Sequence, residues 1–182
     1  MTLFAPPPVP VFAAGYSYLN TDFNTLIQDS LGFCTTGIVF RADQESGNQS
    51  LSSSGSGNNV ITYDTVLEDP YGGWSATATG SQLAHSWLAP YTGWYEVTTT
   101  YSIATANVIT EAIVLVTNAT EYDLCEITNV SQTEGGGGGS VIVPLIGGVD
   151  YLQGLVQVSA NVTTDTSAPG RYPQMQVSFY SQ

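Results

Sequence analysis

Apolar and polar residues alternate along residues 94–104. Successive side chains of a strand point to opposite faces, so this period of two predicts a strand with one buried face and one solvated face. The predicted buried face carries Tyr95, Val97, Thr99, Tyr101 and Ile103. Such a strand is typical of an antiparallel sheet that packs on a core with one side only.

Short segments rich in Val, Ile, Thr and aromatic residues recur along the chain and predict further strands. They cover residues 37–41, 59–64, 83–88, 108–117, 140–145, 151–160 and 174–180, with a short edge strand at 49–52. Pro144 is expected at the end or the edge of its strand, because proline has no N–H to donate. Glycine and proline turns separate the segments, and eight or more short strands predict an all-β, antiparallel jelly-roll sandwich.

Two segments are predicted as surface loops of variable conformation. Residues 45–59 are mainly Ser, Gly and Asn, which favour loops and turns. Residues 135–139 are five consecutive glycines, and we expect a flexible loop tip there. A phosphate-binding loop is the alternative, but the lysine and the following helix that such loops use are missing.

The first 35 residues follow a different pattern. Pro6, Pro7, Pro8 and Pro10 favour extended polyproline geometry, and residues 20–33 have the apolar spacing of a short helix. The segment before the helix is too apolar for a free tail, and we expect it to dock on a neighbouring subunit. Its docking residues are predicted to be Leu3, Phe4, Pro7, Val9, Val11 and Phe12. The chain is therefore divided into a docking arm with a short helix, residues 1–35, and a jelly-roll domain, residues 36–182.

Composition narrows the possible partners. Only 9% of the 182 residues are charged, the only cationic residues are two arginines, and the formal net charge is −13. A surface this acidic repels phosphate backbones and anionic lipid, which excludes nucleic acid as a partner and disfavours membranes. No apolar run is long enough to insert into a bilayer.

The start of the chain lacks the cationic region of a signal peptide, so we expect synthesis in the cytoplasm without export. Cys34 and Cys125 are accordingly expected to be buried thiols rather than a disulfide.

The residues that could carry chemistry are few. His85 is the only histidine, so it is expected to be a sheet residue rather than a general base, and no standard zinc site can form. A calcium-binding site is an alternative at two acidic places, Glu68-Asp69 and the group Glu121, Asp123 and Glu126, although neither has the spacing of a calcium loop. A glycosidase with two carboxylates also stays open, but no acid pair is identified. We therefore expect no catalytic residue, no cofactor and no resident metal.

Residues 84–97, AHSWLAPYTGWYEV, contain two of the three tryptophans. Pro90 and Gly93 fit a tight turn between two strands. The strands would point their large side chains inward or toward a symmetry axis, where aromatic burial stabilises a core or a subunit contact. The residues predicted for the core or the trimer contact are Trp87, Tyr95, Val97, Tyr101 and Phe179.

Three motifs, in order along residues 36–182, resemble the C1q/TNF jelly-roll family. Residues 59–64, NVITYD, are similar to the strand that ends in an aromatic-Asp pair in that family. Residues 87–97, WLAPYTGWYEV, resemble its F-x-A-P-x-x-G-x-Y-x-F motif, and residues 140–157 resemble its strand, Gly-Asp turn and strand. The turn departs from the family pattern, because Gly148-Val149-Asp150 is one residue longer. The resemblance implies a jelly roll that forms a compact homotrimer.

The N-terminal third resembles small structural proteins of the tailed phages of actinobacteria. The likeness rests on the proline-rich start and on G-x-x-x-x-x-T-D-x-N-x-L-I at residues 15–27. It implies a virion protein without catalytic activity, most simply a trimeric minor tail or tail-tip protein at the particle surface that helps to contact the host. The arm would bind other virion proteins, and the displayed jelly roll could bind a host surface glycan. A decoration protein on the outside of the capsid is the alternative location.

Two other functions stay open at this point. A carbohydrate-binding module would use an exposed Trp74 together with tyrosines. A secreted C1q-like ligand of a cell would need an export signal, which we do not expect here.

Overall fold

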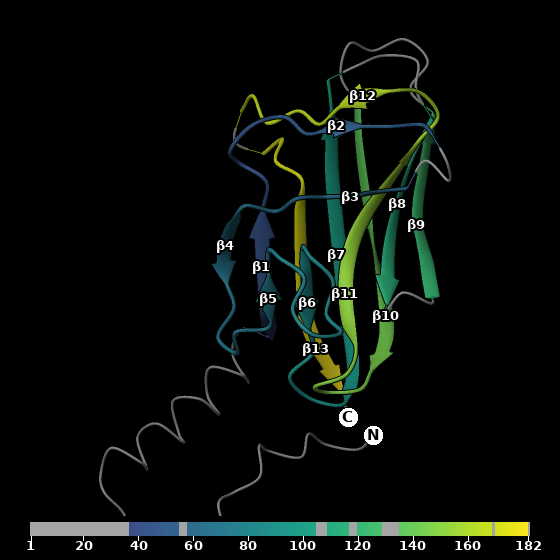
Figure 1. Cartoon of the computed structure of the whole chain (residues 1–182). Coiled ribbons are helices and arrows are strands. Elements are labelled where there is room, and N and C mark those ends of the chain that lie inside the picture. The colour runs from purple at the N-terminus through teal and green to yellow at the C-terminus, as the bar shows by residue number, and fades with distance from the viewer. Residues whose placement is uncertain are drawn as a thin grey trace, which may run out of the picture.

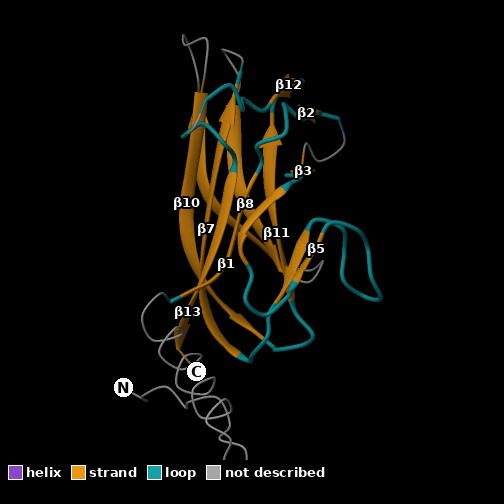
Figure 2. Ribbon diagram, turned by 90° about the vertical axis from the view of Figure 1, so that its left-hand side faces the viewer, coloured by secondary structure: helices purple, strands orange, loops and turns teal. Residues whose placement is uncertain are grey.

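The computed structural model describes residues 37–54, 58–104, 109–116, 120–128, 135–168 and 170–181. These residues form thirteen strands and contain no helix, so none of their elements is a helix that could span a bilayer. Two antiparallel sheets lie face to face and make one sandwich (Figures 1 and 2). The predicted arm and helix lie outside the described residues, and so do Cys34 and the side chain of Cys125.

The first layer is a five-stranded antiparallel sheet. Its strands, from one edge to the other, are β10 (Gly135–Leu145), β7 (Gly93–Ile103), β13 (Gln174–Ser181), β1 (Ile38–Asp43) and β4 (Thr65–Glu68). The last described strand, β13, therefore lies between the first described strand, β1, and the long strand β7. Pro144 lies near the end of an edge strand, as predicted, because no neighbour needs an N–H from it there.

The second layer is a six-stranded antiparallel sheet. It holds β5 (Trp74–Ser75), β6 (Ser86–Leu88), β11 (Tyr151–Val158), β8 (Ile109–Val116) and β9 (Thr120–Thr128), in that order, and β3 (Asn58–Val60) pairs with β11. A separate pair, β2 (Ser50–Leu51) and β12 (Val162–Thr163), closes the upper end in Figure 1. This arrangement confirms the predicted antiparallel jelly-roll sandwich, and β2 confirms the predicted short edge strand.

The core fills the space between the two sheets. Along β7 the burial alternates strictly, with Tyr95, Val97, Thr99, Tyr101 and Ile103 buried, as the sequence pattern predicts. The largest fully buried side chains are Trp87, Tyr63, Tyr95, Tyr151 and Phe40. Aromatic side chains of this size bury about 150–250 Å² each, so they contribute much of the apolar area that stabilises the sandwich.

The five glycines do not form a loop tip, which corrects the sequence-based expectation. Residues 135–139 are the first half of β10 and pair in register with residues 99–103 of β7. A Cβ atom on Gly138 would overlap the carbonyl oxygen of Thr99, and one on Gly136 would lie 2.6 Å from that of Tyr101. Glycine is therefore needed because the two backbones approach closely, and the run marks a tight edge strand.

Two predicted strands are shorter than the sequence suggests. Of residues 59–64 only the first two are in β3, and the chain then crosses from the second sheet to the first. The crossing is visible in two backbone hydrogen bonds: the Ile61 N–H donates to the Gly154 carbonyl oxygen, and the Asp64 N–H donates to that of Asp43. Burial still alternates there, but one ladder cannot continue across two sheets. Of residues 83–88, only Ser86–Leu88 form a strand.

Candidate functional site

The five residues predicted for the core or a trimer contact all lie inside the single chain. Trp87 packs edge-to-face on Tyr95, with ring centroids 5.8 Å apart, and Tyr95 packs in the same way on Phe179 at 5.0 Å. Val97 and Tyr101 are buried on the same face of β7, further along the strand. These side chains hold the two sheets together, so any contact between subunits has to use other residues.

Two turns at the lower end of the sandwich in Figure 1 are locked together. The Ala89 N–H donates to the Asp150 carbonyl oxygen at 2.9 Å, and the Gly148 N–H donates to that of Ala89 at 2.8 Å. The Gly147 N–H also donates to the Thr92 hydroxyl. The turn before β7 and the turn after β10 therefore form one fixed platform, in which Gly148 has the positive φ (71°) that favours glycine.

An open hollow of about 640 Å³ lies at this platform. Its lining is Thr92, Gly93, Trp94, Pro144, Leu145, Ile146 and Asp150. Trp94 is 45% exposed and Ile146 is 55% exposed, which leaves two large apolar side chains open to solvent in one place. We call this feature the end hollow. The strand alternation could have found Trp94, because that pattern places it on the solvated side of β7.

The outward side chains of β7, β10 and β13 form a second feature, which we call the outer face. Its members beyond the end hollow are Glu96, Thr98, Thr100, Ser102, Ser140, Ile142, Gln174, Gln176, Ser178 and Tyr180. Glu96 is the single charged residue in this set, and the hydroxyls of Thr98 and Ser140 lie 2.6 Å apart in a hydrogen bond. Ile142 and Tyr180 are 42% and 57% exposed.

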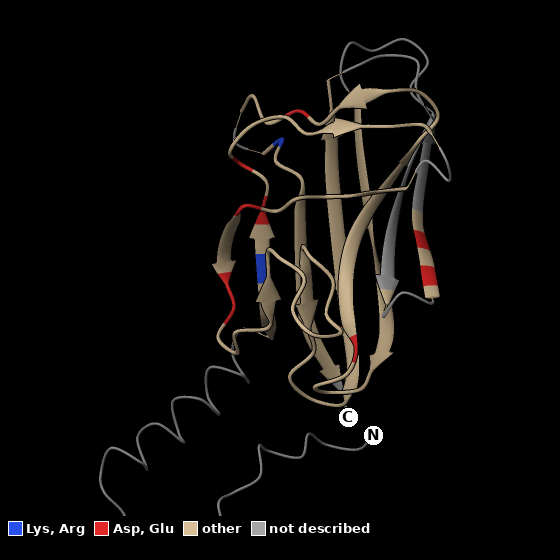
Figure 3. Cartoon of the chain, viewed as in Figure 1, with Lys and Arg blue, Asp and Glu red and all other residues tan. Residues whose placement is uncertain are grey.

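Acidic residues gather away from the outer face. Figure 3 shows them along β4 and its flanking loops and on β9. Several already accept hydrogen bonds within the chain. Asp69 accepts the N–H groups of Gly73 and Trp74 at 3.0 and 2.9 Å, and Glu121 accepts the amide of Asn58. Within the described part of the chain, no three His, Cys, Asp or Glu residues gather in a way that could hold a metal ion.

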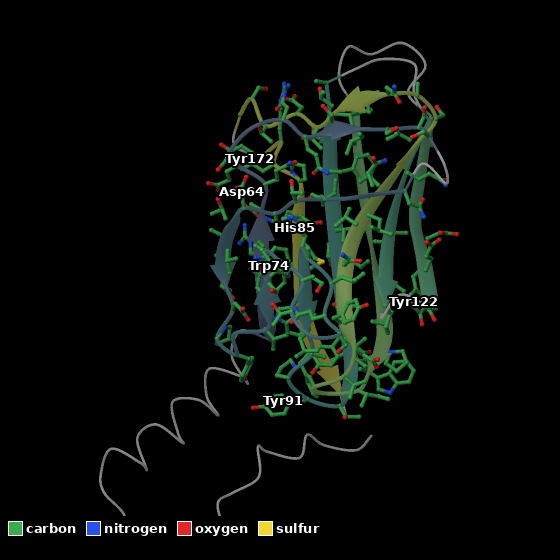
Figure 4. The ribbon with its side chains drawn as sticks, in the orientation of Figure 1. Asp64, Trp74, His85, Tyr91, Tyr122 and Tyr172 are labelled. Atoms are coloured by element: carbon green, nitrogen blue, oxygen red, sulfur yellow. The ribbon has the colours of Figure 1, made fainter. Side chains whose placement is uncertain are left out.

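His85 lies in the turn before β6 and not in a strand, which corrects its predicted place. Its φ is 55°, an uncommon backbone conformation for a residue with a side chain. The ring lies beside Trp74, with centroids 6.3 Å apart (Figure 4). Its Nδ1 atom is buried and makes no hydrogen bond to the described residues. The ring therefore packs as part of the wall around Trp74.

Trp74 is not an exposed aromatic platform, contrary to the carbohydrate-binding interpretation. It is half-buried and stacks on Phe40 with ring centroids 5.3 Å apart and an interplanar angle of 20°. Tyr63 packs on it edge-to-face. Because these neighbours cover the ring, the geometry that would favour sugar stacking falls to other aromatic residues, of which Trp94 and Tyr180 are the most exposed.

Two ionisable groups in the described part of the chain, Tyr63 and Asp165, have pKa values shifted in the direction that keeps them in their usual form at neutral pH. Burial raises the pKa of Tyr63, and the nearby Asp43 raises it further. Hydrogen bonds from Ser167, with help from Arg171, lower the pKa of Asp165, whose carboxylate lies 2.9 Å from the guanidinium. Near neutral pH, Tyr63 therefore stays protonated and Asp165 stays ionised. Groups that keep a fixed protonation state suit a structural role better than proton transfer.

Comparison with known proteins places the fold. No family model matches the chain, and no curated protein matches it in sequence. Among solved structures, murine APRIL matches with 10% identity, a TM-score of 0.55 and coverage of 78% of this chain and 98% of its own. The globular domain of zebrafish complement C1qA matches with 11% identity and a TM-score of 0.53, and the match covers 79% of this chain and 98% of that one. The Eiger TNF of S. frugiperda matches with 14% identity and a TM-score of 0.51, and the match covers 80% of this chain and 94% of that one.

The chain therefore has a C1q/TNF-like jelly-roll fold. The three motifs that suggested this fold lie at the β3–β4 crossing, at the β6–β7 turn and at the β10–β11 turn. The extra residue in the last turn is accommodated by Gly148 and by the Asp150 side chain, which accepts the Ile146 N–H at 2.7 Å. The departure from the family pattern thus changes one turn and not the fold.

Proposed function

We propose that this protein is a non-enzymatic structural component of a tailed-phage virion that works as a homotrimer. Within that class we place it in the tail, as a minor tail or tail-tip protein at the particle surface that contributes to host contact. The fold supports the structural role, because its large side chains are used for cohesion. The sequence of residues 1–27 supports the phage assignment through its resemblance to structural proteins of actinobacterial phages.

The distribution of charge carries the proposal of self-association. With a formal net charge of −13, copies of the chain repel one another wherever acidic surfaces meet. The outer face has one acid among its ten residues and exposes Ile142 and Tyr180. It is therefore a broad surface that a second copy can approach without bringing many like charges together.

The edges of the same sheet favour a closed ring. The outer face lies at the β10 side, whereas Val66 and Leu67 are exposed on β4 at the opposite edge, 41% and 45% respectively. Two different patches on one molecule make heterologous contacts, which close into a ring when the rotation between copies allows it. A trimer built in this way would also cover both sheet edges, which protects them from uncontrolled strand pairing.

Attachment to the particle is assigned to the arm. In this proposal residues 3–12 bind another virion protein, and the jelly roll is displayed outward, where exposed aromatic residues outside the trimer contact, such as Trp94, can bind a host surface glycan. A decoration protein on the capsid shell would use the same parts at a different location. Immunogold electron microscopy of intact particles separates the two, since label on the tail supports the proposal and label on the head supports the alternative.

The oligomer is tested by sedimentation of the full chain. We expect the wild type to be trimeric and Ile142→Asp to be monomeric. The new carboxylate places a second negative charge beside Glu96, its cross-strand neighbour in β7, within the proposed contact between subunits. Thr77→Asp, which places the same charge on an exposed loop, is the control and should stay trimeric. Near-ultraviolet circular dichroism checks that both variants are folded. A monomeric wild type, or a trimeric Ile142→Asp, would overturn this assignment of the contact.

A further inference from the structure

We propose that the end hollow is a docking site for the proline-rich segment of its own chain, residues 3–12, LFAPPPVPVF. The hollow exposes Trp94 and Ile146, two large apolar side chains that the sandwich core leaves open to solvent. Docking there would cover Trp94 and Ile146 with the apolar residues of the segment. The arm would be held against the jelly roll until another virion protein takes it up.

The chemistry of the hollow fits such a segment. Grooves that recognise polyproline helices are lined by aromatic side chains, against which the proline rings pack. The end hollow offers Trp94 next to Pro144 and Ile146. A polyproline helix has three residues per turn, so Pro7 and Pro10 project from the same side and can enter one hollow together. Because proline fixes its own backbone, the segment loses little conformational entropy on binding.

The charges of the segment and of the hollow are also compatible. No side chain among residues 1–21 is charged, so docking of the segment buries no charged side chain. The hollow contains one acid, Asp150, and its carboxylate already accepts the Ile146 N–H at 2.7 Å. The remaining lining is apolar or uncharged, which favours an apolar ligand over an ionic one.

The strand order places the start of the described chain close to the hollow. The Gly37 carbonyl oxygen accepts the Phe179 N–H, and Phe179 pairs with Tyr95, the neighbour of Trp94. Gly37 is therefore two strand spacings from Tyr95, or about 10 Å. Residues 13–36 could span at most about 80 Å, so the segment reaches the hollow easily. A tether of this kind gives an effective concentration in roughly the millimolar range, which favours the hollow of the same chain.

Photo-cross-linking of the full-length protein tests the proposal. The photoreactive residue p-benzoylphenylalanine replaces Phe12, or Phe4 in a second preparation, and mass spectrometry maps the cross-linked peptides. We expect cross-links to residues 92–94 and 144–150. Trp94→Ser should reduce their yield at least several-fold, because it removes the largest apolar wall of the hollow. Tyr180→Ser removes an aromatic residue that is more exposed but lies outside the lining, and it should leave the yield unchanged.

Two results would overturn the proposal. Cross-links that fall elsewhere on the jelly roll, or that persist in Trp94→Ser, would show that the end hollow is not the site. In a mixture of ¹⁵N-labelled and unlabelled protein, cross-links joining a labelled to an unlabelled peptide would show docking on a neighbouring chain instead of the same chain. Neither readout depends on the trimer or on a virion, so failure here leaves the proposed function standing, and the reverse also holds.

Discussion

The Tyr95 hydroxyl donates a 2.6 Å hydrogen bond to the Tyr91 carbonyl oxygen and accepts a longer one from the Tyr91 N–H. One buried side chain of β7 thus satisfies both backbone groups of a residue in the preceding turn. The same turn is bonded to the β10–β11 turn and shapes the end hollow. A residue of the core therefore positions the surface feature that we assign to docking.

Removal of this hydroxyl should destabilise the protein without changing its fold. In Tyr95→Phe the ring still fills the core, but the Tyr91 backbone loses its partner, and an unpaired buried group costs about 1–3 kcal/mol. We expect a loss of that size in the free energy of unfolding, measured by urea titration with tryptophan fluorescence. Tyr180→Phe, which removes an exposed hydroxyl, is the control. Equal stability of both variants would show that the Tyr95–Tyr91 bond contributes nothing.

Asp69 should act as a structural cap and not as a calcium ligand. Its carboxylate accepts the N–H groups of Gly73 and Trp74 and, at 3.3 Å, the indole N–H of the buried Trp87. Asp69→Ala leaves these donors unpaired, and hydrogen bonds to charged groups contribute about 1.5–3 kcal/mol. We expect a loss of stability in this range by urea titration.

The neighbouring exposed acid is the control for that experiment. Glu68→Ala should change the free energy of unfolding by less than about 0.5 kcal/mol, as is usual for surface substitutions. Calorimetric titration of the wild type with calcium should give no binding heat. A calcium heat that disappears in Asp69→Ala would contradict the capping role.

Side-chain periodicity predicted the sandwich well. The alternation along β7 is a local property, because one face of a single strand is enough to show it. The motif with Pro90 and Gly93 likewise identified a turn whose neighbours, Trp87 and Tyr95, enter the core. These features depend on residues close together in sequence, and such features can be read without the fold.

Contacts between distant segments explain what the sequence did not reveal. The glycines of β10 suggest a loop until the facing backbone of β7 is known to exclude a Cβ atom. Trp74 suggests an exposed platform until Phe40, from another strand, is found stacked on it. The end hollow needs two turns that are more than fifty residues apart and are joined by hydrogen bonds such as Gly147 to Thr92. Composition and spacing contain no signal for such pairings.

Acid should weaken the fold partly through Asp64. Burial acts to raise the pKa of this carboxyl, but the hydrogen bonds from the Glu45 and Ser46 N–H groups outweigh it, and the pKa is lowered. A lowered folded-state pKa means that the carboxylate stabilises the protein above the ordinary aspartate pKa of about 3.9, and that this contribution disappears as the pH falls through the folded-state value.

Asp64→Asn tests this interpretation. The variant should be less stable than the wild type at pH 7, and its free energy of unfolding should fall less steeply below about pH 4. Urea titrations at pH 7, 5, 4 and 3 measure the difference. Glu68→Gln removes an exposed carboxylate of equal charge and controls for the change in net charge. If both variants lose the same acid dependence, general charge repulsion and not the Asp64 hydrogen bonds is responsible.

The close approach of β10 to β7 should make the glycine run intolerant of even one methyl group. In Gly138→Ala the new Cβ would overlap the Thr99 carbonyl oxygen, which belongs to the backbone and cannot rotate away. The strands must separate locally, and overpacking of this kind costs about 1–3 kcal/mol. Ser140→Ala is the matched control, because it lies two residues further along the same strand, on the solvated face, and loses only the exposed hydrogen bond to Thr98, which should cost about 0.5–1 kcal/mol. Hydrogen exchange should show faster amide exchange along residues 135–141 in Gly138→Ala only. Protection at wild-type level in that variant would mean that residues 135–139 are not held against β7.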